Sequence, residues 1–194
     1  MSAQLLAYES IRSDSSALLN GRNLTGWMSQ GGDWKVEGGV LRASFHCSNG
    51  KSRLLTRQMY RDYELSGEYR LEQPGSAALC LRADPVTSGR PCIELKTDTS
   101  QGCPLGLYEW EGRGWIIRVE TAAKAAFRPG NWNQLRLRVT GDSVRVWLND
   151  QLLFRCRDSA IAHSPAAIGL QLDGNESALC YWRRLRIRNL SKAF

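Results

Sequence analysis

The sequence predicts an all-β protein in which two antiparallel sheets stack as a jelly-roll sandwich. Residues 132–153 alternate apolar and polar side chains around two tight-turn signals. About a dozen short apolar runs with turn residues between them fill the rest of the chain, as in sandwiches. The alanine-rich stretch 120–127 is the one helix-like piece. A chain of 194 residues can bury a sizeable core, so we expect one domain over residues 1–194.

The clearest element is a strand pair, because side chains alternate faces with a period of two in a strand. A two-residue loop at 141–142 would place all six apolar side chains of the pair on one face. The partners it predicts are Val139 with Val144, Leu137 with Val146, and Leu135 with Leu148. Asn149-Asp150 offers a second tight turn. Since this meander covers only one side of a core, a second sheet or a helix must close it.

The remaining strands follow from the other apolar runs, taken in chain order. Turn residues such as Asn20-Gly21 and Gly38-Gly39 separate the first of them. The runs include residues 18–19, 34–36, 40–41, 54–55, 63–69, 77–81, 93–97, 105–110, 115–119, 168–172 and 178–190.

The net charge of +7 comes mostly from arginine, which favours anionic partners or a solvated basic surface. Alternation puts arginines of the last strand on one face, and with arginines of the central strand pair they could form a basic sheet face. These residues are Arg184, Arg186, Arg188, Arg136, Arg138 and Arg145. The chain has no recognisable nucleic-acid-binding motif, so the sequence argues against nucleic acid as a partner.

Six cysteines form no CxxC pair, which argues against a zinc ribbon. We expect reduced thiols; in an exported chain up to three bridges are open, and Cys92 and Cys103 bracket a plausible short loop. No apolar run reaches the roughly 18 residues of a membrane span. Residues 1–16 lack the apolar core of a signal peptide. The chain as it stands is expected in the cytoplasm, or outside the cell if an export signal was removed.

Six segments stand out in order along the chain: LLNGRNLTGW at 18–27, WKVEGGVL at 34–41, GNWN at 130–133, VWLN at 146–149, IGLQ at 168–171 and WRRLRI at 182–187. Together they resemble the 3-keto-disaccharide hydrolase domain family over residues 18–190. The resemblance implies a sandwich of the concanavalin A-like lectin/glucanase type, in agreement with the strand pattern. It also implies a carbohydrate ligand or substrate.

Enzymes of this family act on sugars oxidised at C3, where the ketone acidifies the C2 hydrogen. A base removes that hydrogen, the group at C1 leaves, and water adds to the unsaturated sugar. Such a site needs a general base and a donor or cation for the enolate oxygen.

The resemblance and the alternation together select four candidate catalytic residues. Arg82 matches the arginine that ends a family strand, and Glu94 matches a family glutamate. By alternation, Lys96 and Asp98 share the face of Glu94. Glu94 and Asp98 lie about 13 Å apart along a strand, farther than the roughly 5 to 9.5 Å between the carboxyls of an ordinary glycosidase pair. The alternative to a catalytic site is that these charged side chains form a solvated ladder of weak cross-strand pairs.

The family's IGLQDHG segment often supplies a histidine, but Asp173 stands at that position here. Asp173 is therefore the second candidate base beside Glu94, and Arg82 or Lys96 would stabilise the enolate. If the histidine binds a metal in relatives, metal binding by this chain is in doubt, and the sequence identifies no metal ligand or cofactor. Candidate sugar-contacting residues are Asp98, Tyr108, Trp110, Trp115 and Gln171, the two tryptophans lying beside glycines in a predicted loop.

Three functions remain open from the sequence. The first is a hydrolase or lyase acting on 3-keto-glycosides. The second is a non-catalytic carbohydrate-binding module of the same fold, favoured by the altered segments at 76–78 and 171–174. The third is a structural or assembly domain that docks through its basic faces. The sequence does not specify an oligomeric state.

Overall fold

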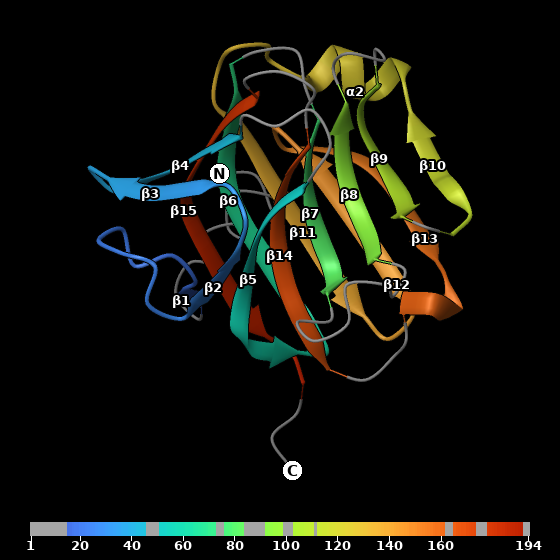
Figure 1. Cartoon of the computed structure of the whole chain (residues 1–194). Coiled ribbons are helices and arrows are strands. Elements are labelled where there is room, and N and C mark those ends of the chain that lie inside the picture. Colours follow the sequence, from blue (N-terminus) through green and yellow to red (C-terminus); the bar gives the residue numbers. More distant parts are fainter. Residues whose placement is uncertain are drawn as a thin grey trace, which may run out of the picture.

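The computed structural model describes residues 15–45, 51–72, 76–83, 92–98, 103–110, 112–161, 165–173 and 178–191. These residues form two antiparallel sheets that pack face to face, with sheet B in front of sheet A in Figure 1. The all-β sandwich predicted from alternation is confirmed.

Sheet A is 8-stranded in the described part of the chain. Its order is β13 (Gln151–Arg157), β12 (Ser143–Leu148), β11 (Asn133–Thr140), β6 (Tyr63–Leu71), β15 (Ala178–Asn189), β4 (Val40–Phe45) and β3 (Asp33–Glu37), with β1 (Ser16–Ala17) beside β15. Sheet B, 7-stranded over the same described residues, has the order β10 (Gly114–Val119), β9 (Cys103–Trp110), β8 (Cys92–Asp98), β7 (Ser76–Ala83), β14 (Ala166–Asp173), β5 (Lys51–Tyr60) and β2 (Trp27–Gln30).

The β11–β12 hairpin has the predicted register. Its pairs are Val139 with Val144, Leu137 with Val146, and Leu135 with Leu148. The second predicted turn is also present, with φ of 48° at Asn149 and 66° at Asp150. Positive φ at both central residues is the signature of a type I′ turn, whose twist matches that of the flanking strands.

The predicted helical segment is α2 (Thr121–Ala126), which contacts β9 of one sheet and β13 of the other. Its Ala123 is buried in the core, so the helix covers one end of the sandwich (Figure 1). A short 3-10 helix, η1 (Ser159–Ile161), buries Ile161 in the same core.

The core lies between the sheets and is one main cluster of leucine, valine and aromatic side chains. Sheet A contributes Leu65 and Leu137, and sheet B contributes Leu79 and Leu170, all nearly inaccessible to solvent. Burying each such side chain is worth at most about 1.5–3 kcal/mol. The inward residues therefore hold the sheets together. On the outer side of sheet B, Leu55, Cys80, Ala83 and Ala167 form a second, smaller buried cluster.

Cys80, Cys156 and Cys180 are free thiols in the described part of the chain. Burial raises the pKa of Cys180 to about 12. Cys47 lies outside the described residues, as do the side chains of Cys92 and Cys103, so a bridge between those two stays a prediction. Over the described chain, no helix is long and apolar enough to cross a membrane.

Candidate functional site

The predicted site residues of three strands lie on the outer face of sheet B. On β14, Ile168, Leu170 and Leu172 enter the core, so Gln171 points the other way, and position 173 follows Gln171 on the same face. The same alternation on β7 turns Ser76, Ala78 and Cys80 outward. Strand β8 aligns with them, since Asp98 pairs with Ser76, Lys96 with Ala78, and Glu94 with Cys80. Directly paired residues share a face, so the register puts the backbone positions of Glu94, Lys96, Asp98 and Asp173 on the same face as Gln171; the side chains of these four lie outside the described residues.

Three parallel rows cross this outer face. The first holds Leu55, Gly169, Cys80, Glu94, Tyr108 and Trp115; the second holds Arg53, Gln171, Ala78, Lys96, Gly106 and Arg118; the third holds Lys51, Asp173, Ser76 and Asp98. In the third row Asp173 and Asp98 flank Ser76 from the two neighbouring strands, about 10 Å apart between backbones. Sequence reasoning missed this pairing because the strand order is not visible in the chain.

The Ser76 hydroxyl is buried and has no hydrogen-bond partner among the described residues. A buried hydroxyl without a partner costs stability, and such groups call for an explanation. A ligand hydroxyl that reaches the third row would supply the missing partner. Ser76 therefore joins the candidate site.

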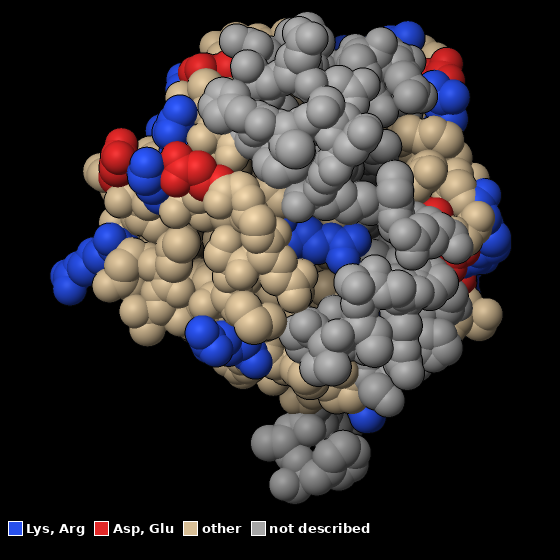
Figure 2. Space-filling model, viewed as in Figure 1, with Lys and Arg blue, Asp and Glu red and all other residues tan. Residues whose placement is uncertain are grey.

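Gln171 is only 1% exposed and is held by its side-chain contacts. Its Oε1 accepts a hydrogen bond from Nε of Arg53 at 2.8 Å and lies 3.9 Å from the Cys80 thiol. Arg53, half-buried, is thereby fixed in the row beside Asp173. Figure 2 shows basic atoms near the middle of the face turned toward the viewer. Arg53 is a functional candidate that the sequence did not reveal, because its position in β5 carries no motif.

Aromatic side chains occupy one end of the first row. Tyr108 meets Trp115 edge-on, with ring centroids 5.2 Å apart. The Arg118 guanidinium lies 5.3 Å from the Trp115 ring centroid. Tyr108 lies in β9, and Trp115 lies in β10, the strand expected at 115–119, so Trp115 is not in the loop that precedes this strand. Trp110 ends β9 in register with Cys92, on a position that shares the face of Tyr108; its side chain lies outside the description.

Arg82 is not brought to these rows. Its Nε donates to the carbonyl of Ile161 at 3.0 Å, Nη1 to that of Tyr60 at 3.2 Å, and Nη2 to that of Arg61 at 2.6 Å. Arg82 is 8% exposed, and burial lowers the pKa of its guanidinium. Its donors tie the end of β7 to η1 and to the β5–β6 turn, so the enolate role of Arg82 stays a prediction that this geometry does not support.

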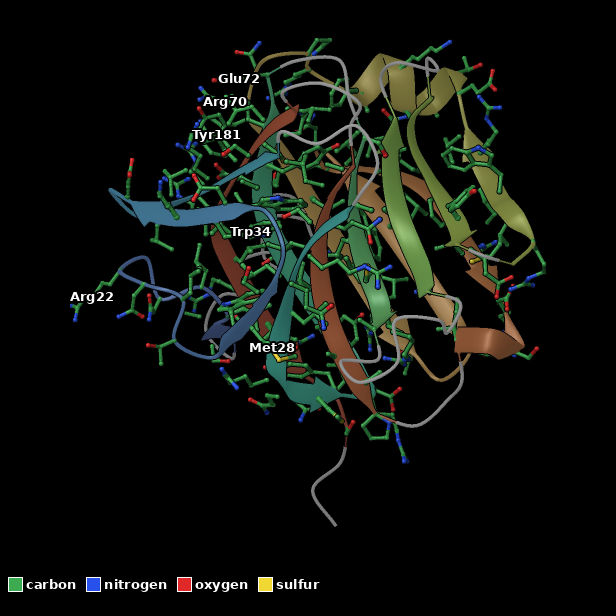
Figure 3. The ribbon with its side chains drawn as sticks, in the orientation of Figure 1. Arg22, Met28, Trp34, Arg70, Glu72 and Tyr181 are labelled. Carbon is green, nitrogen blue, oxygen red and sulfur yellow. The ribbon has the colours of Figure 1, made fainter. Side chains whose placement is uncertain are left out.

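The outer face of sheet A carries a pocket of about 300 Å³. It is lined by Glu68, Arg128, Trp132, Gln134, Asn149, Asp150 and Arg183. Glu68 is ion-paired with Arg183 at 2.5 Å and with Arg184 at 2.9 Å. Near it, Arg70 contacts Glu72 at 2.7 Å and lies 4.6 Å from the Tyr181 ring centroid, a cluster labelled in Figure 3. Because its carboxylate is already paired, Glu68 is a weak candidate for a base, and the pocket is better suited to binding than to catalysis.

Metal ligation has no structural support among the described residues, where no group of three or more histidine, cysteine or acidic side chains converges.

Comparisons with known proteins place this geometry in context. The model of the 3-keto-alpha-glucoside-1,2-lyase-like domain family matches residues 14–188. No curated protein matches the chain significantly.

Similar solved structures share the fold at low sequence identity. They include carbohydrate binding module CBM66 from Bacillus subtilis (18% identity, TM-score 0.68, covering 84% of this chain and 96% of that chain). A putative glycosyl hydrolase from Parabacteroides distasonis is similar at 18% identity and a TM-score of 0.67, covering 94% and 97%. A beta-glucanase from Bacillus licheniformis is similar at 13% identity and a TM-score of 0.67, covering 91% and 98%. The concanavalin A-like fold is thereby confirmed.

Proposed function

The chain belongs to the 3-keto-alpha-glucoside-1,2-lyase-like domain family and is a carbohydrate-active domain, and from this premise we propose that the outer face of sheet B binds and cleaves a 3-keto-glycoside. The observation that carries the proposal is the shared face of Glu94, Lys96 and Asp173, which adjacent strands bring to neighbouring rows. A base and a cation on one surface are what an elimination next to a ketone requires.

The proposed reaction starts with Asp173 or Glu94 as base. The carboxylate takes the C2 proton, and the electrons of that C–H bond move into an enolate whose oxygen is the former C3 carbonyl. In this proposal Lys96 stabilises this oxygen, and Arg53 adds positive charge one strand beyond Gln171. The enolate then expels the C1 oxygen, which leaves with a proton as the alcohol, and water adds across the C1–C2 double bond.

Release of a chromogenic alcohol tests the proposal. The chain is incubated with nitrophenyl 3-keto-glucosides of both anomeric forms, and exchange of the C2 hydrogen with deuterated water is followed by NMR. We expect release by the wild type and a loss of about 10²–10⁴-fold in kcat for whichever of Asp173→Asn and Glu94→Gln removes the base. Gln134→Ala, on the opposite sheet, is the matched control. Absence of both release and exchange across pH 5 to 9, with and without divalent metal, would reject catalysis.

A carbohydrate-binding module is the second candidate. It is favoured by the aromatic corner of Tyr108 and Trp115 and by Asp173 at the family's histidine position. This function predicts glycan binding without turnover, weakened by Trp115→Ala. A glycan array in which no sugar binds would count against it. The third candidate, an assembly domain, predicts a salt-sensitive oligomer by light scattering.

A further inference from the structure

Three arginines form an uninterrupted row across the outer face of sheet A. Arg138 of β11 pairs directly with Arg145 of β12, and Arg145 pairs directly with Arg155 of β13. All three are exposed. We call Arg138, Arg145 and Arg155 the arginine row.

No carboxylate in the described part of the chain neutralises the arginine row. The register places Glu64 next to Arg138 on β6. However, the Glu64 carboxylate accepts a hydrogen bond from Arg188 at 2.9 Å and lies 3.6 Å from Arg136. The Glu64 carboxylate is therefore already paired with Arg188 of β15 and Arg136 of β11.

The arginine row is unfavourable for folding alone. Neighbouring strands lie about 4.8 Å apart, and like charges directly opposite each other destabilise a sheet. Elsewhere on the same sheet, arginines are paired with acids, as Arg183 is with Glu68. An external anion would offset the repulsion in the arginine row.

The surroundings of the row distinguish between classes of polyanion. The aromatic ring in the next row is Trp147, and the Arg136 guanidinium lies over it at 4.0 Å from the centroid. The indole therefore does not offer a bare face for stacking a base, which single-stranded nucleic acid binding requires. Arg138 and Arg145 form the third residue pair from the 141–142 turn, on a sheet face and not on a helix that could enter a groove.

We propose that the arginine row binds an acidic polysaccharide, whose carboxylate or sulfate groups lie across β11, β12 and β13. This inference goes beyond the proposed function, since the row lies on the sheet opposite to the proposed catalytic face. Guanidinium groups bind carboxylate and sulfate-like anions through paired N–H donors. A sugar polymer anchored here would leave the outer face of sheet B free.

Titration calorimetry with defined polymers tests the proposal. The probes are oligogalacturonate (carboxylated), heparin fragments (sulfated), neutral dextran and single-stranded DNA. The wild type should bind an acidic oligosaccharide with an affinity that falls as salt rises, and dextran should not bind. The variant Arg138→Ser/Arg145→Ser/Arg155→Ser should lose tenfold or more in affinity, which is about 1.4 kcal/mol.

The control variant removes the same number of charges elsewhere. It is Arg22→Ser/Arg57→Ser/Arg61→Ser, all exposed residues outside β11–β13; Arg22 projects from the loop near the N-terminus in Figure 3. This control should keep its affinity within a factor of two to three. Equal weakening of both triple variants would mean that only net charge matters, and would overturn the proposal. Tighter binding of DNA than of either acidic oligosaccharide would also overturn it.

Thermal unfolding gives a second readout that does not depend on catalysis. An acidic oligosaccharide should raise the Tm of the wild type and leave that of the row variant unchanged, because a ligand stabilises only the state that binds it. Asp173→Asn and Glu94→Gln should bind acidic oligosaccharides normally. Failure of the 3-keto-glycoside reaction would therefore leave this inference standing, and failure here would leave the reaction untouched.

Discussion

The indole of Trp115 lies over the backbone of Gly106, although across the β9–β10 pairing Trp115 is opposite Tyr108 and Gly106 is opposite Arg118. A Cβ built on Gly106 would come within 2.5 Å of Trp115 Cζ3 and within 2.5 Å of the Ile117 carbonyl oxygen. The Trp115 ring therefore occupies the space that a side chain at position 106 would need.

Gly106→Ala should displace Trp115 and destabilise the fold. Because the Ile117 carbonyl belongs to the backbone, it cannot move aside as a flexible side chain would. We expect a loss of about 1–3 kcal/mol in the free energy of unfolding, measured in urea. Adding Trp115→Ala should not restore that stability, because the contact with Ile117 remains. Full recovery in the double variant would mean that only the indole opposes the methyl group.

Arg82→Met should lower the stability of the fold but leave the catalytic rate of the folded protein nearly unchanged. The carbonyls of Ile161, Tyr60 and Arg61 would lose their donor at a buried position, at a cost of about 2–4 kcal/mol. Chemical denaturation measures the cost. In the fraction that remains folded, kcat for a 3-keto-glucoside should stay within about threefold of the wild type. A variant of unchanged stability but abolished turnover would return Arg82 to the catalytic set.

Arg82 also marks the limit of sequence reasoning about the site. Strand alternation correctly predicted the β11–β12 register. It carries no information about Arg82, where β7 takes three residue steps, Cys80 to Ala83, while its partner β14 takes two, Gly169 to Ala167. One extra residue in a strand re-aims the side chains that follow it, and no residue type in this segment announces such a bulge.

Strand order sets a second limit. The row that joins Asp173, Ser76 and Asp98, and the contact of Arg53 with Gln171, depend on which strands are neighbours. These strands are far apart in the chain, so local alternation carries no information about their pairing. The family resemblance indicates the fold, but its strand motif is altered at residues 76–78, and no quoted motif includes Arg53.

Asn133→Ala should be among the most destabilising polar substitutions outside the proposed catalytic face. Asn133 is fully buried; its Oδ1 accepts from the Arg128 amide and from Asn149, and its Nδ2 donates to the carbonyls of Arg128 and Asn131. Removing the amide group leaves these polar groups without partners, so we expect a loss of about 2–4 kcal/mol in urea denaturation. Asn131→Ala is the exposed control, since its side chain makes one hydrogen bond, to the Pro129 carbonyl. A difference below about 1 kcal/mol between the two variants would contradict this view.

Protonation of Glu109 at acid pH should lower the stability of the fold. Its carboxylate accepts hydrogen bonds from Nε and the backbone amide of Arg113, and this guanidinium also reaches Asp158 at 2.8 Å. The hydrogen bond from the Arg113 side chain lowers the pKa of Glu109 below its ordinary value. A group whose pKa is lower in the folded state stabilises the fold fully above its unfolded pKa, and this stabilisation is lost as the pH falls through the folded pKa.

Wild-type stability should therefore fall from about pH 5 downward. Glu109→Gln should be less stable than the wild type at pH 7 but show a shallower decline in acid. Urea denaturation at a series of pH values compares the two proteins, with Glu120→Gln, an exposed acid, as the control. Parallel curves for the wild type and Glu109→Gln would show that the ion pair with Arg113 does not couple protonation to folding.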